Sequence, residues 1–347
     1  MSDDETRSIN LALQGGGSHG AFTWGVIDHL LEDGRLTFDG ISATSAGAMN
    51  AVVYAYGKMR GGPDGARQAL HDFWQRVSRS AAPYSPLALT PIEKLFGVPA
   101  ERSWAYTTFE SLTRTFSPYQ LNPRNLNPLR DVLAACVDFD ELQHCKCSKL
   151  FLSATNIRTG NVRVFNTAEI TIEAVLASAC LPFLFQAIEI DGAFYWDGGY
   201  MGNPSLFPLF YETSSRDVVV VHINPIFCAD IPKSAAEIAD RVNEITFNAA
   251  LLKEFRAVAF VTKLLEDGWI KDEYRTKLRH VLVHSIRADD ALNTLGAASK
   301  VNADWHFLTD LRDRGRATAE QWLAENYIHL GKRATVNLAS EYLNPGQ

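Results

Sequence analysis

A serine between a strand-like and a helix-like segment is the first residue in this chain with the context for chemistry. Ser45 follows a predicted strand at 38–44 and precedes a predicted helix at 46–56. A serine at such a sharp turn is presented above a sheet edge, where it can attack an acyl group as a nucleophile. Ala43 and Gly47 are small enough to let the strand and the helix approach each other closely.

A glycine loop precedes this serine turn and is also set between a strand and a helix. The predicted strand covers 9–14 and the predicted helix covers 19–33. Backbone N–H groups at the positive end of that helix could hold the oxyanion of an acyl-transfer reaction. The loop lacks the Gly-Lys-Ser/Thr ending of a phosphate-binding loop, which argues against nucleotide binding. The alternative that the loop only packs the helix on the strand is left open. The candidate donors are Gly15, Gly16, Gly17 and Ser18.

A third glycine turn supplies a candidate for the base. Asp197 is followed by Gly198 and Gly199, and it ends the second arm of a predicted hairpin that turns at Asp191-Gly192. The alternative base is one of nine histidines, as in a Ser-His-Asp triad. His222 and His284 lie in predicted strands, where a packed or solvent-facing histidine is the commoner outcome. The residues alone leave the base open.

Composition and charge exclude several classes of protein. The 347 residues carry a net charge of −7 and no run of Lys or Arg, so nucleic acid is not an expected partner. Five cysteines, an odd number, fit reduced thiols in a cytoplasmic protein, and the Cys145–Cys147 spacing does not suit zinc. We expect no metal and no cofactor. The acidic N-terminus has no signal peptide, and no apolar run reaches the ~18 residues of a transmembrane helix, so membrane contact would be peripheral.

Successive strand, turn and helix units predict an α/β fold with a mostly parallel central sheet between two layers of helices. We interpret 1–347 as a single domain. Residues 58–129, rich in proline and aromatics, are interpreted as an insertion of loops and short helices, with one helix expected around 66–77. Residues 235–347 are expected to form covering helices, beginning with one at 235–265 whose apolar positions fit a core-packed helix better than a membrane contact.

The aromatic residues of the insertion have two interpretations. They could form a lid or an acyl-chain surface, or they could only pack the insertion itself, since exposed and buried aromatics look alike in sequence. The residues concerned are Tyr84, Phe96, Trp104, Tyr106, Phe109, Phe116 and Tyr119.

Four ordered blocks resemble those of the patatin-like phospholipase family. They lie at 14–20, 43–47, 176–182 and 196–199, and 127–131 also resembles bacterial members. The resemblance spans 9–203. It implies a lipid acyl hydrolase, with Ser45 as nucleophile, Asp197 as general base in place of histidine, and the N–H groups around Gly15 to Ser18 as oxyanion donors. Ser178, in the third block, is expected to be structural.

The resemblance leaves the substrate open. His19 stands where many relatives have arginine, which removes a permanent charge and weakens the expectation of a phospholipid substrate. Ala43 stands where such a turn often has glycine. An acyltransferase, an esterase for short or polymeric hydroxyacyl esters, and a noncatalytic lipid-binding module are the alternatives. The expected partner is an acyl lipid or a membrane surface, and the oligomeric state stays open.

Overall fold

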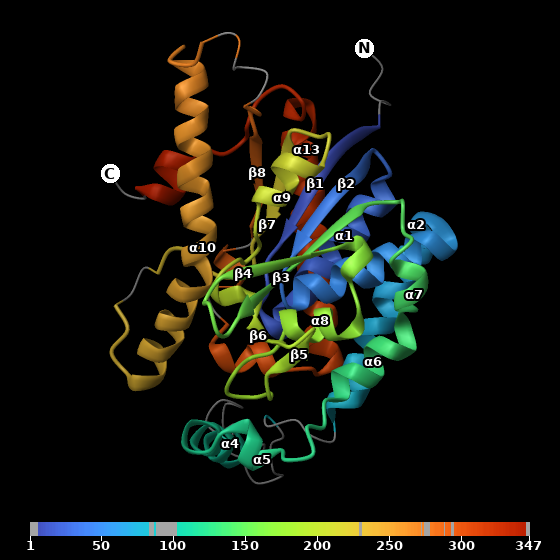
Figure 1. The fold of residues 1–347 in the computed structure, drawn as a ribbon, viewed down its shortest axis with the longest axis vertical. Coiled ribbons are helices and arrows are strands. Elements are labelled where there is room, and N and C mark those ends of the chain that lie inside the picture. Colours follow the sequence, from blue (N-terminus) through green and yellow to red (C-terminus); the bar gives the residue numbers. More distant parts are fainter. Residues whose placement is uncertain are drawn as a thin grey trace.

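A computed structural model describes residues 6–82, 87, 103–228, 231–271, 273, 278–287, 289–292 and 295–344. At its centre is an eight-stranded sheet (Figure 1). Seven strands follow the order β5-β6-β3-β2-β1-β7-β8, and β4 pairs with β3. The strands are β1 Arg7–Leu13, β2 Leu36–Ala43, β3 Lys149–Asn156, β4 Val162–Asn166, β5 Ile188–Ile190, β6 Ala193–Asp197, β7 Asp217–Val221 and β8 Leu282–Ile286.

The middle of the sheet is parallel, and this brings the first two turns together. β1 pairs in parallel with β2 and β7, and the outer pairs β2–β3 and β7–β8 are parallel as well. Leu13 is in register with Ala43, so the glycine loop and the serine turn leave the same edge of the sheet side by side. β4, β5 and β6 are antiparallel additions next to β3.

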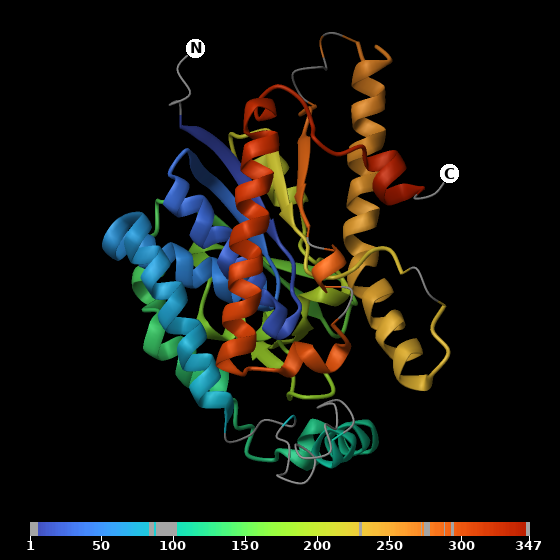
Figure 2. The same ribbon diagram turned by 180° about the vertical axis from the view of Figure 1, so that it is seen from behind.

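Helices cover both faces of the sheet, so the predicted three-layer α/β/α architecture is confirmed. Leu11 and Leu13 of β1 contribute to one hydrophobic core, with α1, α2 and α13, whereas Ala12 contributes to a second core with α9 and α10. This alternation is the period of two expected of a strand buried on both faces. Figure 2 shows α13 crossing the face opposite α10. The helices are α1 Gly20–Asp33, α2 Ala46–Ala81, α4 Trp104–Thr115, α5 Pro118–Leu121, α6 Pro128–Cys136, α7 Phe139–Leu142, α8 Ile172–Ser178, α9 Phe207–Glu212, α10 Ala235–Glu266, α12 Asp289–Leu292 and α13 Trp305–Asn326.

Two predicted helix boundaries are wrong. The helix after Ser45 does not end at Gly57 but continues as α2, with a kink at Gly61 and Gly62 before Pro63. Beyond the kink, the helix expected around 66–77 is confirmed, and it packs against the body through buried apolar side chains such as Phe73. At the C-terminus, the two helices expected at 304–313 and 317–326 are one helix, α13, because nothing in that segment breaks it.

The apolar stripe of α10 also differs from the prediction. Leu251 and Phe255 are fully buried against the sheet, as expected of a core-packed helix. The first half of the same helix extends beyond the sheet, and there Ile238, Val242 and Ile245 are exposed. The helical period was correct, but it does not specify how much of the helix has a partner.

The described part of the insertion is loosely attached. α4 has no buried residue, and the side chains of Trp104 and Tyr119 are exposed. α4 and α5 lie together at one end of the molecule, beyond the loops of β5 and β6 (Figure 1). Two of the aromatic residues in the prediction, Tyr84 and Phe96, lie outside the described residues.

Candidate active site

Ser45 lies at a strained turn between β2 and α2. Its backbone has φ 54° and ψ −121°, and a residue with a side chain rarely adopts a positive φ unless its surroundings hold it there. Two hydrogen bonds hold the turn: Gly47 N–H donates to Thr44 O at 2.9 Å, and Ser45 N–H donates to Ser178 Oγ at 2.9 Å. A side chain at Gly47 would lie 2.5 Å from Leu13 O, so only glycine lets α2 start this close to β1.

Asp197 is completely buried at the end of β6. Its Oδ1 accepts the N–H of Gly199 at 2.7 Å, while its Oδ2 has no hydrogen-bond partner in the described part of the chain. Burial raises the pKa of this carboxyl to about 7, and the N–H of Gly199 and, more weakly, the Ser45 hydroxyl act in the opposite direction. The hydroxyl is therefore near the carboxylate without a regular hydrogen bond to Oδ2. Side chains at Gly198 or Gly199 would collide with Ser153 O or Phe247.

The glycine loop lies directly against the serine. A Cβ on Gly15 would be 2.6 Å from the Cβ of Ser45. The prediction of Gly15 as an oxyanion donor needs correction, because its N–H already donates to Asn203 Oδ1 at 2.7 Å. The N–H groups of Gly16, Gly17 and Ser18 donate to no other described residue. Three of the four predicted donors thus remain available to a ligand.

Buried amide side chains from distant segments hold this loop. Gln14 Oε1 accepts the N–H groups of Ile223 and Asn224, both at 3.0 Å, and Gln14 Nε2 donates to Asn248 Oδ1 at 3.2 Å. Asn224 Nδ2 donates to Gly15 O at 2.6 Å. Sequence analysis missed Asn203, Asn224 and Asn248, because no motif marks them and they meet the loop only in the folded chain.

Ser178 has a more specific place than the structural role predicted for it. It ends α8 (Ile172–Ser178), and its fully buried hydroxyl oxygen accepts the N–H of Ser45. Two residues further on, Cys180 O accepts the N–H of Asp197 at 2.8 Å. The third sequence block therefore contacts the backbones of both Ser45 and Asp197.

The histidines of the expected alternative triad are engaged elsewhere. His284 Nε2 lies 3.0 Å from Asp217 Oδ1, at the start of β7 and so at the sheet edge opposite Ser45. His222, just after β7, contacts Ser285 Oγ at 3.2 Å. His19 lies in the glycine loop itself, but burial and then the charge of Lys300 lower its pKa to about 3, and its Nε2 lies 2.7 Å from Ser299 Oγ.

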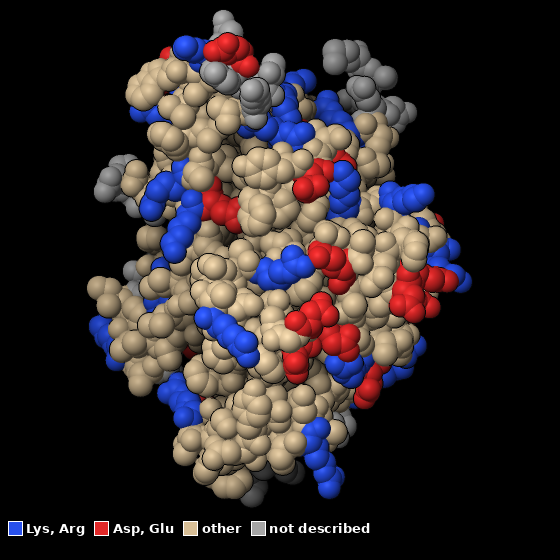
Figure 3. All heavy atoms as spheres, viewed as in Figure 1, with Lys and Arg blue, Asp and Glu red and all other residues tan. Residues whose placement is uncertain are grey.

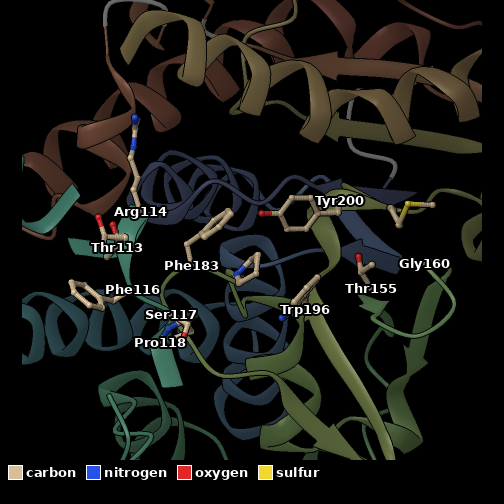
Figure 4. Close-up of a pocket in the computed structure, with 13 residues that line it drawn as sticks. Thr113, Arg114, Phe116, Ser117, Pro118, Thr155, Gly160, Phe183, Trp196 and Tyr200 are labelled. Atoms are coloured by element: carbon tan, nitrogen blue, oxygen red, sulfur yellow. The ribbon is translucent and has the colours of Figure 1, made fainter. Parts of the chain in front are cut away.

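An apolar pocket of about 620 Å³ lies beside the site. It lies between the α4–α5 segment and the residues that follow α8 and Asp197. In Figure 4, Phe183 lies between Phe116 on one side and Tyr200 and Trp196 on the other. Ser45 is not among the residues that line it, so the pocket is next to the site and not part of it. Its apolar lining includes Phe116, Pro118, Pro182, Phe183, Trp196 and Met201.

The surface over α4 and α5 is poor in charge. Figure 3 shows Lys, Arg, Asp and Glu mixed over the middle of one face, with few of them at the end where α4 and α5 lie. Among the residues described, no helix combines the length and the apolar character needed to cross a bilayer. In the same part of the chain, no three His, Cys, Asp or Glu side chains are grouped to hold a metal ion.

The sequence matches one protein family, and solved structures with limited similarity are found. The sequence model of the family described as patatin-like phospholipase matches residues 11–210. VipD from Legionella pneumophila is 16% identical, with a TM-score of 0.39 over 92% of this chain and 67% of VipD. The type III effector ExoU is also 16% identical, with a TM-score of 0.36 over 93% of this chain and 54% of ExoU, so the chain spans about half of that protein. No curated protein matches in sequence. Because the family model covers more than half of its length, this chain belongs to the patatin-like phospholipase family.

Proposed function

We propose that the protein hydrolyses carboxylic esters of acyl lipids, with Ser45 as nucleophile and Asp197 as general base. The observation that carries this proposal is the carboxyl of Asp197, which is buried near the Ser45 hydroxyl. One of its oxygens has no hydrogen-bond partner among the described residues, and its pKa is about 7. A base with an ordinary aspartate pKa of ~3.9 would accept a serine proton poorly, whereas one near 7 is matched to neutral pH.

The first half of the reaction forms an acyl-enzyme. Ser45 Oγ attacks the ester carbonyl carbon while its proton passes to Asp197 Oδ2. The carbonyl oxygen becomes an oxyanion, which accepts hydrogen bonds from the free N–H groups of Gly16, Gly17 and Ser18. When the intermediate collapses, the bond to the leaving alkoxide breaks, and Asp197 returns the proton to it. The products are an acylated Ser45 and an alcohol or lysolipid.

The second half regenerates the serine. Asp197 removes a proton from water, the hydroxide attacks the acyl carbon, and the same N–H groups stabilise the second oxyanion. Collapse releases the fatty acid, and the proton on Asp197 returns to Ser45 Oγ. An acyltransferase would follow the same route with a lipid alcohol in place of water, so the acceptor alone distinguishes the two activities.

The surroundings of the site support a lipid substrate of the phospholipase A or lysophospholipase type. The apolar pocket is lined by Tyr200 and Met201, which follow Asp197 closely, and by Phe183, which follows α8. The segments that hold the two proposed catalytic residues thus continue into an apolar surface. We infer that contact with a lipid surface would be peripheral and would involve this end of the molecule.

The test is an assay of purified protein on phospholipids, lysolipids, acylglycerols and short p-nitrophenyl esters. Ser45→Ala and Asp197→Asn should each lower kcat by at least about 10³-fold. Ser340→Ala and Asp64→Asn, at exposed positions, should retain the activity of the wild type. A fluorophosphonate probe should label the wild type and not Ser45→Ala. Equal turnover by all five proteins, or labelling of another serine, would overturn the proposal.

A further inference from the structure

A segment near the C-terminus closes on the glycine loop. The 3₁₀ helix η6 (Ala297–Val301) packs on η1 (Gly17–His19), and Ser299 Oγ contacts His19. The carbonyl oxygen of Lys300 lies against the Cα of Gly17, where a side chain would collide with it. Gly17 also has φ 59°, so both its conformation and this close contact favour glycine. The region lies outside residues 11–210, which the family model covers.

The side chain of Lys300 reaches round the loop from Gly17 to Gly16. Its Nζ donates to Asn224 Oδ1 at 3.0 Å, and Asn224 Nδ2 donates to Gly15 O at 2.6 Å. Asn224 Oδ1 is also 3.7 Å from the point where a Cβ on Gly16 would lie. The ammonium group is therefore one side chain away from the loop with the free N–H groups.

Lys300 brings a positive charge to this loop. It is partly buried, and burial lowers its pKa, while Glu244 and Asp240 on α10 raise it. The third titratable group that faces it, His19 in η1, is neutral at physiological pH, because burial and the charge of Lys300 hold its pKa at about 3. His19 therefore adds no second positive charge beside Lys300.

We propose that Lys300 is a positioning residue for the reaction at Ser45: its ammonium group, held through Asn224, stabilises the negative charge that forms on the substrate at the glycine loop. This inference rests on the proposed function. A cation in a partly buried site acts more strongly than one in water. It also orders the N–H donors, because Asn224 bonds to both the lysine and Gly15. Loss of the charge should reduce turnover of every ester, whatever its head group.

The experiment compares Lys300→Met, Lys300→Arg and the exposed control Lys332→Met on a neutral p-nitrophenyl ester and on an anionic phospholipid of the same acyl chain. Lys300→Met should lower kcat on both substrates by about 10- to 100-fold with little change in KM. Lys300→Arg should restore kcat to within about threefold. Lys300→Arg should also extend activity to higher pH, because arginine keeps its charge at pH values where a lysine loses its proton. Lys332→Met should match the wild type.

Several results would overturn the inference. Loss of activity on the phospholipid alone would assign Lys300 to head-group binding. An equal loss of kcat in Lys300→Met and Lys300→Arg, with an unchanged pH profile, would show that Lys300 contributes only packing. If Lys300→Met does not fold, as judged by its thermal unfolding, the pH profile of Lys300→Arg decides. A wild type that hydrolyses no ester would overturn the proposed function itself. An active wild type with an equally active Lys300→Met would overturn only the role of Lys300.

Discussion

The edge of the sheet that carries Ser45 and the insertion that carries α4 are built in opposite ways. Ser45 and Asp197 are 8% and 0% exposed, and glycines at the turns leave no space for a side chain. In α4, by contrast, no residue is buried, and Trp104 is 77% exposed. Backbone contacts fix the first region, while the second is connected to the body through few of its side chains.

This difference separates two kinds of sensitivity to mutation. In the close-packed region, one added methyl group meets backbone atoms that cannot move aside, so stability and activity should fall together. In the exposed region, a large aromatic side chain contributes little to folding and is available to a substrate or a lipid surface. Substitutions matched between the two regions test whether this separation is real.

The largest effect is expected at Gly17. Gly17→Ala forces a Cβ into Lys300 O at a positive φ, and we expect a loss of several kcal/mol in the free energy of unfolding and about 100-fold or more in kcat. Gly34→Ala is the matched control, since Gly34 also has a positive φ, 75°, but open space around it. It should cost about 1 kcal/mol and leave kcat intact. Denaturant unfolding measures the loss of stability, and ester turnover measures the loss of kcat. Equal losses in the two variants would contradict the claim that the packing of the glycine loop matters more than that of an exposed turn.

The second effect concerns the pH dependence caused by Asp197. The pKa of Asp197 is about 7 in the folded protein, against an ordinary value of 3.8 for an exposed aspartate. Burial of the neutral carboxyl therefore favours folding below about pH 4. That contribution is lost as pH rises through 7, at a cost of roughly 3 to 5 kcal/mol. Asp197→Asn removes the charge and should therefore be more stable than the wild type at pH 8.5 but not at pH 4.

Activity should change with pH in the opposite direction. The wild type should gain activity as pH rises through about 7, because the base must be ionised. Unfolding by urea at the two pH values and a pH profile of kcat/KM measure these effects. Asp64→Asn, at a position 95% exposed, is the control for stability. A stability gain of Asp197→Asn that is the same at both pH values would contradict the raised pKa.

A smaller effect is expected at Ser178. Ser178→Ala leaves the N–H of Ser45 without its partner, which should cost about 1 to 3 kcal/mol and lower kcat about tenfold by loosening the turn. Thr171→Ala is the control. Thr171 lies at the other end of α8, where its hydroxyl oxygen accepts the N–H of Ala174 at 3.2 Å. Thr171→Ala should lower the thermal midpoint to a similar degree and leave kcat unchanged. A similar fall in kcat for both would show that α8 acts only through overall stability.

The smallest effect on stability is expected in the exposed region. Phe116 is 43% exposed and lines the apolar pocket, so Phe116→Ser should change the free energy of unfolding by no more than about 0.5 kcal/mol. If α4 and α5 form the predicted lid or acyl-chain surface, turnover of phospholipid vesicles should fall severalfold while turnover of a soluble short ester is unchanged. Phe260→Ser, at an exposed position of α10 that does not line the pocket, is the control. A large loss of stability would show that the aromatics pack the insertion.

Much of the fold was predictable because its signals are local. The strand, turn and helix units at Gly15 and Ser45 predict parallel strands, and the Asp191-Gly192 turn predicts the hairpin that ends at Asp197. Where the prediction was wrong, the missing information was long-range. The helical period of α10 continues through Ile238 and Val242. These residues lie beyond the part of α10 that packs on the sheet, so their side chains are exposed.

The sequence by itself therefore determined which residues stand at the turns, and that the turns at Gly15 and Ser45 share one edge of the sheet. Two successive strand, turn and helix units predict parallel strands, and parallel strands place their carboxyl ends at the same edge. Only the tertiary structure brought Asp197 to that edge, through the antiparallel pairing of β6 with β3. Only the tertiary structure decided which loop N–H groups stay free, since Asn203 takes that of Gly15. It also decided the basicity of Asp197 and the approach of Lys300. Both depend on burial and charge contributed by segments far apart in the chain, and no local pattern records those contacts.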